Sequence, residues 1–102
     1  MTLTQIGALL TVLECGAFTE AGKRLYMTQS AVSQAISALE EELGVAILVR
    51  ERRKAITLTV AGVRIVAHLR RLMNEVSAVK EIAEQEKKTP LRSEEHTSEL
   101  QS

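Results

Sequence analysis

Apolar residues recur at steps of three and four along most of this 102-residue chain. This is the spacing of helices that bury one face. The pattern changes after Gly44, where two β-branched and aliphatic runs, 45–50 and 56–58, flank a charged stretch. Such runs predict a two-stranded hairpin. The predicted helices cover about 4–14, 19–25, 28–43 and 60–87, so we expect a mainly α fold with one small hairpin.

The ends of the predicted helices carry residues that suit helix caps. Gly16 suits the C-terminal cap of the first helix. Thr19, Thr28 and Thr59 suit the N-caps of the next three, because a threonine hydroxyl accepts a hydrogen bond from a backbone N–H in the first turn. Gly22 lies inside the second helix, at a cost of about 1 kcal/mol relative to alanine. We expect a close approach of the next helix to explain it.

The third predicted helix has two faces of different character. Its apolar stripe, which needs a core, consists of Ala31, Val32, Ala35, Ile36, Leu39 and Leu43. Near its start the opposite face carries short, uncharged hydrogen-bonding side chains, namely Gln29, Ser30, Ser33, Gln34 and Ser37. The acidic residues Glu40–Glu42 stand at the far end. A helix of this kind could enter a DNA major groove; taken alone, it could equally be a polar face without a function.

The context of this helix favours the DNA-binding interpretation. About three residues join it to the short helix before it, which is the spacing of a helix-turn-helix whose second helix is presented to the groove. The hairpin that follows would be the wing of a winged helix, with a basic tip placed to reach phosphates or a minor groove. The basic residues of this wing are Arg50, Arg52, Arg53 and Lys54. A solvated charged turn is the alternative.

The distribution of charge is more informative than its sum. The formal net charge is zero, but residues 50–71 contain seven basic residues and one acidic residue, Glu51, which gives +6. A neutral total therefore hides a basic patch suited to nucleic acid.

The last predicted helix carries a second apolar pattern. Steps of four and three, typical of the a/d seam of a coiled coil, connect Ile65, Leu69, Leu72, Val76, Val79 and Ala83. We expect the first two turns to pack on the domain itself and the remainder to meet a second copy of the chain. A homodimer is therefore predicted.

The C-terminal residues differ in kind from the rest. Pro90 ends the last helix, and residues 90–102 have no hydrophobic periodicity, so a disordered tail is expected. Arg92–Ser102 matches the in-frame translation of a widely used sequencing-library adapter, so we interpret it as an artefact. Without it the net charge of residues 1–91 is +2, twelve basic minus ten acidic. We predict a winged helix-turn-helix over 1–58, a linker and dimerisation helix over 59–89, and a native protein that continues beyond about residue 91.

Other features argue against catalysis and secretion. The chain has no aspartate, no phosphate-binding glycine loop, and one histidine outside the tail, His68, without a second ligand nearby. We predict no enzyme, no metal and no cofactor. The single cysteine, Cys15, excludes an intramolecular disulfide and is expected to be a buried structural thiol. Neither a signal peptide nor a membrane span is visible, so a cytoplasmic protein is expected.

Four blocks of the sequence together resemble the N-terminal DNA-binding domain of LysR-type bacterial transcriptional regulators. They are Gly16–Leu25, Thr28–Ser33, Leu39–Gly44 and Leu58–Gly62, within a match that runs from about Thr4 to Leu72. The resemblance implies a winged helix joined by a long linker helix to an effector-binding domain, which this chain lacks. It also implies a homodimer, a tetramer in the full-length protein, and a small-molecule effector for the missing domain.

The resemblance also assigns roles to single residues. The exposed recognition face would hold the base-reading residues Gln29, Ser30, Ser33, Gln34 and Ser37. The residues expected at the DNA backbone are Thr28, Arg50, Arg52, Arg53 and Lys54. Family members often have Pro at Ser30, Arg at Gln34, Ala at Gly22 and Phe at Leu48, so no base preference is carried over. The alternatives are the related domain of molybdate-responsive regulators and a winged helix used only for protein contacts.

Overall fold

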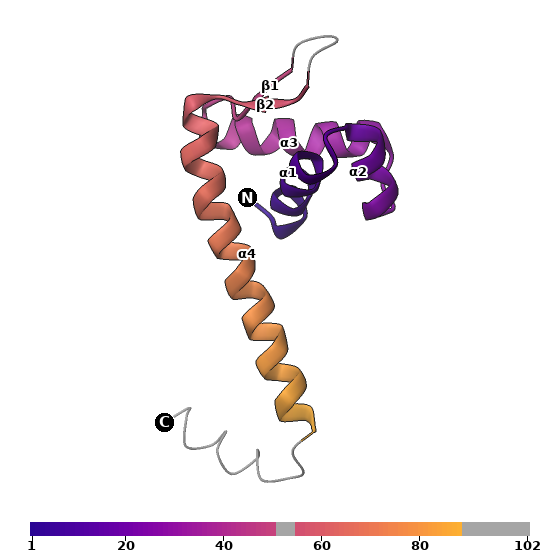
Figure 1. Ribbon diagram of the computed structural model, residues 1–102, viewed down its shortest axis with the longest axis vertical. Coiled ribbons are helices and arrows are strands. Elements are labelled where there is room, and N and C mark those ends of the chain that lie inside the picture. Colours follow the sequence, from indigo (N-terminus) through magenta and orange to yellow (C-terminus); the bar gives the residue numbers. More distant parts are fainter. Residues whose placement is uncertain (51–54, 89–102) are drawn as a thin grey trace. The chain divides into compact units, whose positions relative to one another are not determined.

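The computed structural model describes residues 1–50 and 55–88. The elements follow in the order α1 (Leu3–Cys15), α2 (Phe18–Leu25), α3 (Gln29–Leu43), β1 (Leu48–Val49), β2 (Thr57–Leu58) and α4 (Val60–Lys87) (Figure 1). The predicted mainly α winged helix-turn-helix is confirmed. The chain divides into two compact units, Met1–Arg71 and Leu72–Ser102.

Helix α1 begins one residue earlier than its apolar pattern predicts. Thr2 and Gln5 form a capping box: the Thr2 hydroxyl accepts a 3.1 Å hydrogen bond from the Gln5 N–H, and Gln5 Oε1 accepts a 3.0 Å bond from the Thr2 N–H. This reciprocal arrangement satisfies two backbone donors at the helix start. The helix ends as predicted at Gly16, whose left-handed φ of 79° lets its N–H donate to the Val12 carbonyl.

The prediction that Thr19 caps α2 is wrong. The helix begins at Phe18, and its N-cap is Ala17, which makes no side-chain capping bond. Thr19 therefore lies inside the first turn, and its hydroxyl turns to Gln29 on α3 instead, at 3.3 Å. The helix ends at Tyr26, which takes a left-handed φ of 57° and is 96% exposed.

Both predicted ends of α3 are confirmed. The Thr28 hydroxyl accepts a 3.0 Å hydrogen bond from the Ala31 N–H, and Gly44 closes the helix in a left-handed conformation with φ 76°. Between these caps the stripe residues Val32, Ile36 and Leu39 are fully buried. Leu43, at the end of the stripe, stays exposed.

Helices α1, α2 and α3 pack against one another around an aliphatic core. Its fully buried members include Ile6, Leu9, Val12, Ala21, Val32, Ile36, Leu39 and Ile47. Gly22 belongs to the contact between α2 and the turn that follows it, because a Cβ there would lie 2.6 Å from the Met27 carbonyl oxygen. A close approach is therefore present at Gly22, but it is made by the turn and not, as predicted, by the next helix, whose nearest atom, the Gln29 nitrogen, would lie 3.6 Å from the Cβ.

The hairpin is shorter than the predicted runs. Within the described residues Leu48 pairs with Leu58 and Val49 with Thr57, in antiparallel register. Just before β1 the Ile47 carbonyl accepts from the Thr59 N–H, its partner in the same register, but the Ile47 N–H donates to the Glu40 side chain and not to the hairpin. Ladder pairing therefore starts only at residue 48.

The N-cap predicted at Thr59 is confirmed and serves two purposes. Its hydroxyl accepts a 2.9 Å bond from the Gly62 N–H of α4 and donates a 2.6 Å bond to the Ala46 carbonyl. Gly62 is buried against Ile47, whose carbonyl oxygen a Cβ would overlap. These contacts attach the start of α4 to the segment that leads into β1.

In the second unit α4 continues to Lys87, as predicted. None of the helices in residues 1–50 and 55–88 combines the length and apolar character needed to cross a membrane.

Cys15 is only partly buried, so the expectation of a buried thiol is wrong. It is the last residue of α1 and lies beside the exposed Gly16.

Candidate nucleic-acid interface

The polar residues predicted to read bases share one accessible face of α3. Gln29, Ser30, Gln34 and Ser37 are exposed and Ser33 is half-buried. The face exists because the opposite stripe of the same helix is buried in the core, which turns these side chains outward. Within the described residues, three of the five make no side-chain hydrogen bond: Ser30, Ser33 and Gln34. These three are free to bond a ligand.

The start of α3 offers a favourable environment for an anion. Its first turn contains no acidic residue, and the first-turn N–H groups not used by the Thr28 cap have no partner within the helix. The helix dipole adds a partial positive charge at this end. The acidic residues stand three turns away. The leading half of α3 therefore suits contact with DNA phosphates and base edges.

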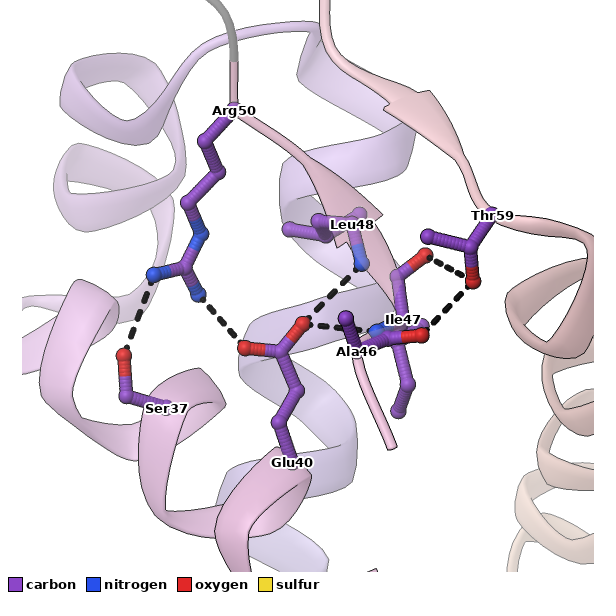
Figure 2. A network of polar contacts seen from close by, with 7 residues as sticks. All are labelled: Ser37, Glu40, Ala46, Ile47, Leu48, Arg50 and Thr59. Carbon is purple, nitrogen blue, oxygen red and sulfur yellow. Dashed lines mark hydrogen bonds and ion pairs between the residues drawn. The ribbon is translucent and has the colours of Figure 1, made fainter. Parts of the chain in front are cut away.

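Arg50, predicted at the DNA backbone, has three partners within the protein, two of which, Ser37 and Glu40, are shown in Figure 2. Its Nη1 donates a 3.1 Å bond to Ser37 Oγ, and its Nη2 lies 3.2 Å from Glu40 Oε1. Its guanidinium carbon lies 5.6 Å from the centroid of the Phe18 ring. Arg50 thus contacts α2 and α3 from the end of β1.

Glu40 is the residue at this site that the sequence analysis missed. Its second oxygen, Oε2, accepts hydrogen bonds from the backbone N–H groups of Ile47 at 2.7 Å and Leu48 at 3.0 Å (Figure 2). The sequence places it in a run of three acids, which suggests only a solvated helix end. Its position next to Leu39 and four residues after Ile36, at the edge of the buried stripe, is the feature that could have identified it.

The wing-tip residues Arg52, Arg53 and Lys54 lie outside the described residues, as do residues 89–102, which include the predicted tail. Their roles stay predictions.

The residues of the predicted dimer seam fall into two groups. In the first unit Leu69 is 5% exposed and belongs to the core, while Ile65 is half-buried. In the second unit Val76 is half-buried, and the exposed members are Leu72, Val79 and Ala83. Val79 is 64% exposed and Leu72 is 40% exposed.

Among residues 1–50 and 55–88, no three His, Cys, Asp or Glu side chains gather to hold a metal ion. His68 is exposed on α4.

This architecture is that of a winged helix-turn-helix: a bracing helix, a capped helix with an exposed polar face, and a hairpin fastened to it. The family model "Bacterial regulatory helix-turn-helix protein, lysR family" matches residues 3–63. The chain belongs to the LysR family, which confirms the resemblance seen in its sequence. The members it matches are transcriptional regulators.

Among curated proteins, the chain is 44% identical over 87 residues to the uncharacterized HTH-type transcriptional regulator YvbU of Bacillus subtilis (strain 168). The match covers 85% of this chain and 30% of YvbU. The chain therefore spans less than a third of the length of this relative.

Two solved structures of similar fold were determined with DNA. The CbnR DNA-binding domain in its DNA complex is 30% identical, with a TM-score of 0.75 over 86% of this chain and 100% of that one. The BenM DNA-binding domain in its complex with catB site 1 DNA is 27% identical, with a TM-score of 0.79 over 86% of this chain and 98% of that one.

Proposed function

We propose that this chain binds double-stranded DNA sequence-specifically, as the DNA-binding part of a cytoplasmic LysR-type transcriptional regulator without catalytic activity. One observation carries the proposal: the leading half of α3 exposes amide and hydroxyl side chains that have no partner in the described protein, and it keeps acidic residues away. Similar domains of CbnR and BenM were solved as DNA complexes, which supports it.

In this proposal the side chains of α3 divide the work by position. Gln29, Ser33 and Gln34, with Ser30 beside them, read base edges in the major groove. A glutamine amide suits adenine, and one good bidentate pair gives about 1–3 kcal/mol of discrimination. The N-terminus of α3 at Thr28 would hold a phosphate and set the register.

The wing would add contacts that do not depend on sequence. Arg52, Arg53 and Lys54 stand at its tip in the sequence, and arginine and lysine there would neutralise phosphates or enter a minor groove. Arg50 was predicted at the DNA backbone and Ser37 among the base-reading residues, but the Arg50 guanidinium already donates a hydrogen bond to the Ser37 hydroxyl.

We further propose that the regulator acts as a homodimer through α4, with a tetramer in the full-length protein. The exposed side chains of Leu72, Val79 and Ala83 would form the seam together with the half-buried Val76 and Ile65, whereas Leu69 is buried in the core of the domain. A dimer would place two α3 helices on half-sites about 34 Å apart, one turn of DNA. A small-molecule effector would bind a domain outside this chain.

The proposal is tested by selecting duplexes from a randomised library with the purified chain and measuring affinity by fluorescence anisotropy. We expect the selected duplex to bind more tightly than a scrambled duplex of the same composition, and both affinities to fall as salt rises. Equal affinity for the two duplexes would overturn sequence-specific binding.

Two variants separate base reading from backbone contact. Gln34→Ala should change the preferred sequence, because it removes an amide from the free part of the recognition face. Arg53→Ala should weaken binding to every duplex and lower the salt slope by about 0.9, the value for one lost phosphate contact. If both variants lose the same affinity on selected and scrambled duplexes, the division of roles is wrong.

A further inference from the structure

We propose that Glu40 and Arg50 are positioning residues that hold the wing against the recognition helix. Together with Ser37 they form a set of contacts that we call the clamp, and Ser37 therefore does not read a base. The proposal rests on the proposed function, because it assigns work within the DNA-binding surface. Arg50 and Ser37, which were predicted to contact DNA directly, would instead support the residues that do.

The Glu40 carboxylate is the centre of the clamp. One oxygen accepts from two consecutive backbone N–H groups, those of Ile47 and Leu48, and the other faces the Arg50 guanidinium (Figure 2). The Glu40 side chain is 16% exposed. Because Glu40 belongs to α3 and its backbone partners lead into β1, a single side chain fixes where the wing leaves the recognition helix.

Arg50 closes the clamp from the other end of β1. Its two terminal nitrogens bond two different residues of α3, Ser37 and Glu40, which lie one turn apart. The ring of Phe18, the first residue of α2, lies beneath its guanidinium. Arginine suits this place because its planar group can fork between two acceptors and stack on a ring at once.

The same contacts make Arg50 a poor partner for a phosphate. Its charge is balanced by a carboxylate 3.2 Å away. Glu40 cannot turn aside to release it without leaving the Ile47 and Leu48 N–H groups unpaired, which is costly for part-buried donors. A DNA phosphate would therefore compete with a partner that the fold itself holds in place.

The supporting role of Ser37 follows from the contacts of Arg50. Its hydroxyl oxygen accepts from Arg50 on the wing side of α3, two turns beyond Gln29. The part of the recognition face left free for bases then ends at Gln34. The clamp thus shortens the predicted reading surface.

The decisive test compares Glu40→Gln with Glu41→Gln, using the selected duplex as the probe. Both variants remove one negative charge from the same turn of α3, but Glu41 is exposed and makes no hydrogen bond or ion pair within the described residues. Glutamine at position 40 can still accept from a backbone N–H, yet its amide nitrogen cannot accept from Arg50. We expect E40Q to bind about tenfold more weakly than E41Q, the loss typical of one charge-assisted hydrogen bond.

If Arg50 contacted a phosphate directly, the order of the two DNA affinities would be reversed. In that case E40Q would free the guanidinium and remove a repulsive charge, so E40Q would bind at least as tightly as E41Q. This outcome overturns the proposal. Thermal unfolding followed by circular dichroism identifies a temperature at which both variants are folded. Affinities measured at that temperature compare folded domains, so a loss of stability does not contribute to the difference in affinity.

Two further variants decide the matter if E40Q does not fold. Arg50→Lys keeps the charge but cannot fork between Ser37 and Glu40, so it should also bind about tenfold more weakly. Wild-type affinity in R50K would show that charge alone suffices. Ser37→Ala should weaken binding to all duplexes without changing the selected sequence, and a changed sequence preference would return Ser37 to base reading.

The outcomes separate the two proposals. A wild-type chain that does not distinguish selected from scrambled duplexes removes the proposed function and this inference with it. A chain that does distinguish them, combined with E40Q binding as tightly as E41Q, removes only the inference.

Discussion

The hydroxyl of Thr19, in the first turn of α2, donates a 3.3 Å hydrogen bond to Oε1 of Gln29, the first residue of α3. The bond ties the bracing helix to the first proposed base-reading side chain. The bond uses one of the two lone pairs of the Gln29 amide oxygen and orients the amide, whose nitrogen makes no hydrogen bond within the described residues. An oriented amide of this kind would favour hydrogen-bond acceptors on the DNA, such as the N7 of a purine.

Thr19→Val should therefore change the base preference at the position that Gln29 reads. Valine has nearly the shape of threonine but no hydroxyl, so the Gln29 amide would be free to turn and to present its oxygen as well. We expect a broader preference at that one position. Selection from a randomised library, followed by sequencing, measures it.

Thr19→Ser is the matched control, because it keeps the hydroxyl and should keep the preference. If the valine variant selects the same sequence as the wild type and only loses affinity for all duplexes, Thr19 does not act through Gln29.

Gly22→Ala should destabilise the domain. A Cβ at this position would lie 2.6 Å from the Met27 carbonyl oxygen, which is backbone and cannot move aside without shifting the turn between α2 and α3. Overpacking of this kind costs roughly 1–3 kcal/mol, which offsets or exceeds the gain of about 1 kcal/mol in helix propensity. Thermal unfolding followed by circular dichroism should show a lower midpoint.

Gly7→Ala is the control for this prediction. Gly7 also lies inside a helix, α1, but a Cβ there meets nothing within 4 Å. The same substitution should therefore stabilise the domain by up to about 1 kcal/mol. Equal shifts of the same sign in both variants would mean that the contact at Met27 does not matter.

Elements that depend on short-range patterns were predictable from the sequence. Helix α3 was placed correctly because the cap at Thr28, the apolar stripe and the turn at Gly44 all lie within it. The cap at Thr59 was found for the same reason. The local pattern gave the wrong cap at Thr19, because the N-cap of α2 is Ala17, which has no capping side chain, and the Thr19 hydroxyl bonds Gln29 on another helix.

The clamp was not predictable, because its partners are distant in sequence and chemically ordinary. In the sequence Glu40 is one of three consecutive acidic residues, which suggests a solvated side chain. Arg50 belongs to a basic stretch, which suggests a side chain available to DNA. Only the fold brings the Glu40 carboxylate to the N–H groups of Ile47 and Leu48, seven and eight residues away. Ladder pairing was overestimated at residue 47 for the same reason, since the Ile47 N–H, which the predicted run 45–50 placed in a strand, donates to Glu40 instead.

Thr59→Val should weaken the junction between the wing and α4. The Thr59 hydroxyl both caps α4 through the Gly62 N–H and donates to the Ala46 carbonyl, so valine removes two hydrogen bonds while keeping the β-branched shape. Loss of a threonine N-cap costs about 0.5–2 kcal/mol. We expect a lower free energy of unfolding in urea titrations. Thr57→Val, at an exposed position of β2, should change it little, and an equal loss there would contradict the assignment.

Tyr26→Asn should stabilise the domain without removing any packing. Tyr26 is 96% exposed and takes φ 57° at the end of α2, a left-handed conformation that costs most residues about 1–2 kcal/mol. Asparagine tolerates this region better, because its short side chain bonds the local backbone. The midpoint of thermal unfolding should rise by several degrees, roughly the shift expected for 1 kcal/mol in a domain of this size. Tyr26→Phe keeps the strained backbone and the ring, so its midpoint should equal that of the wild type. A rise in the phenylalanine variant, or none in the asparagine variant, would show that the backbone at Tyr26 is not the source of strain.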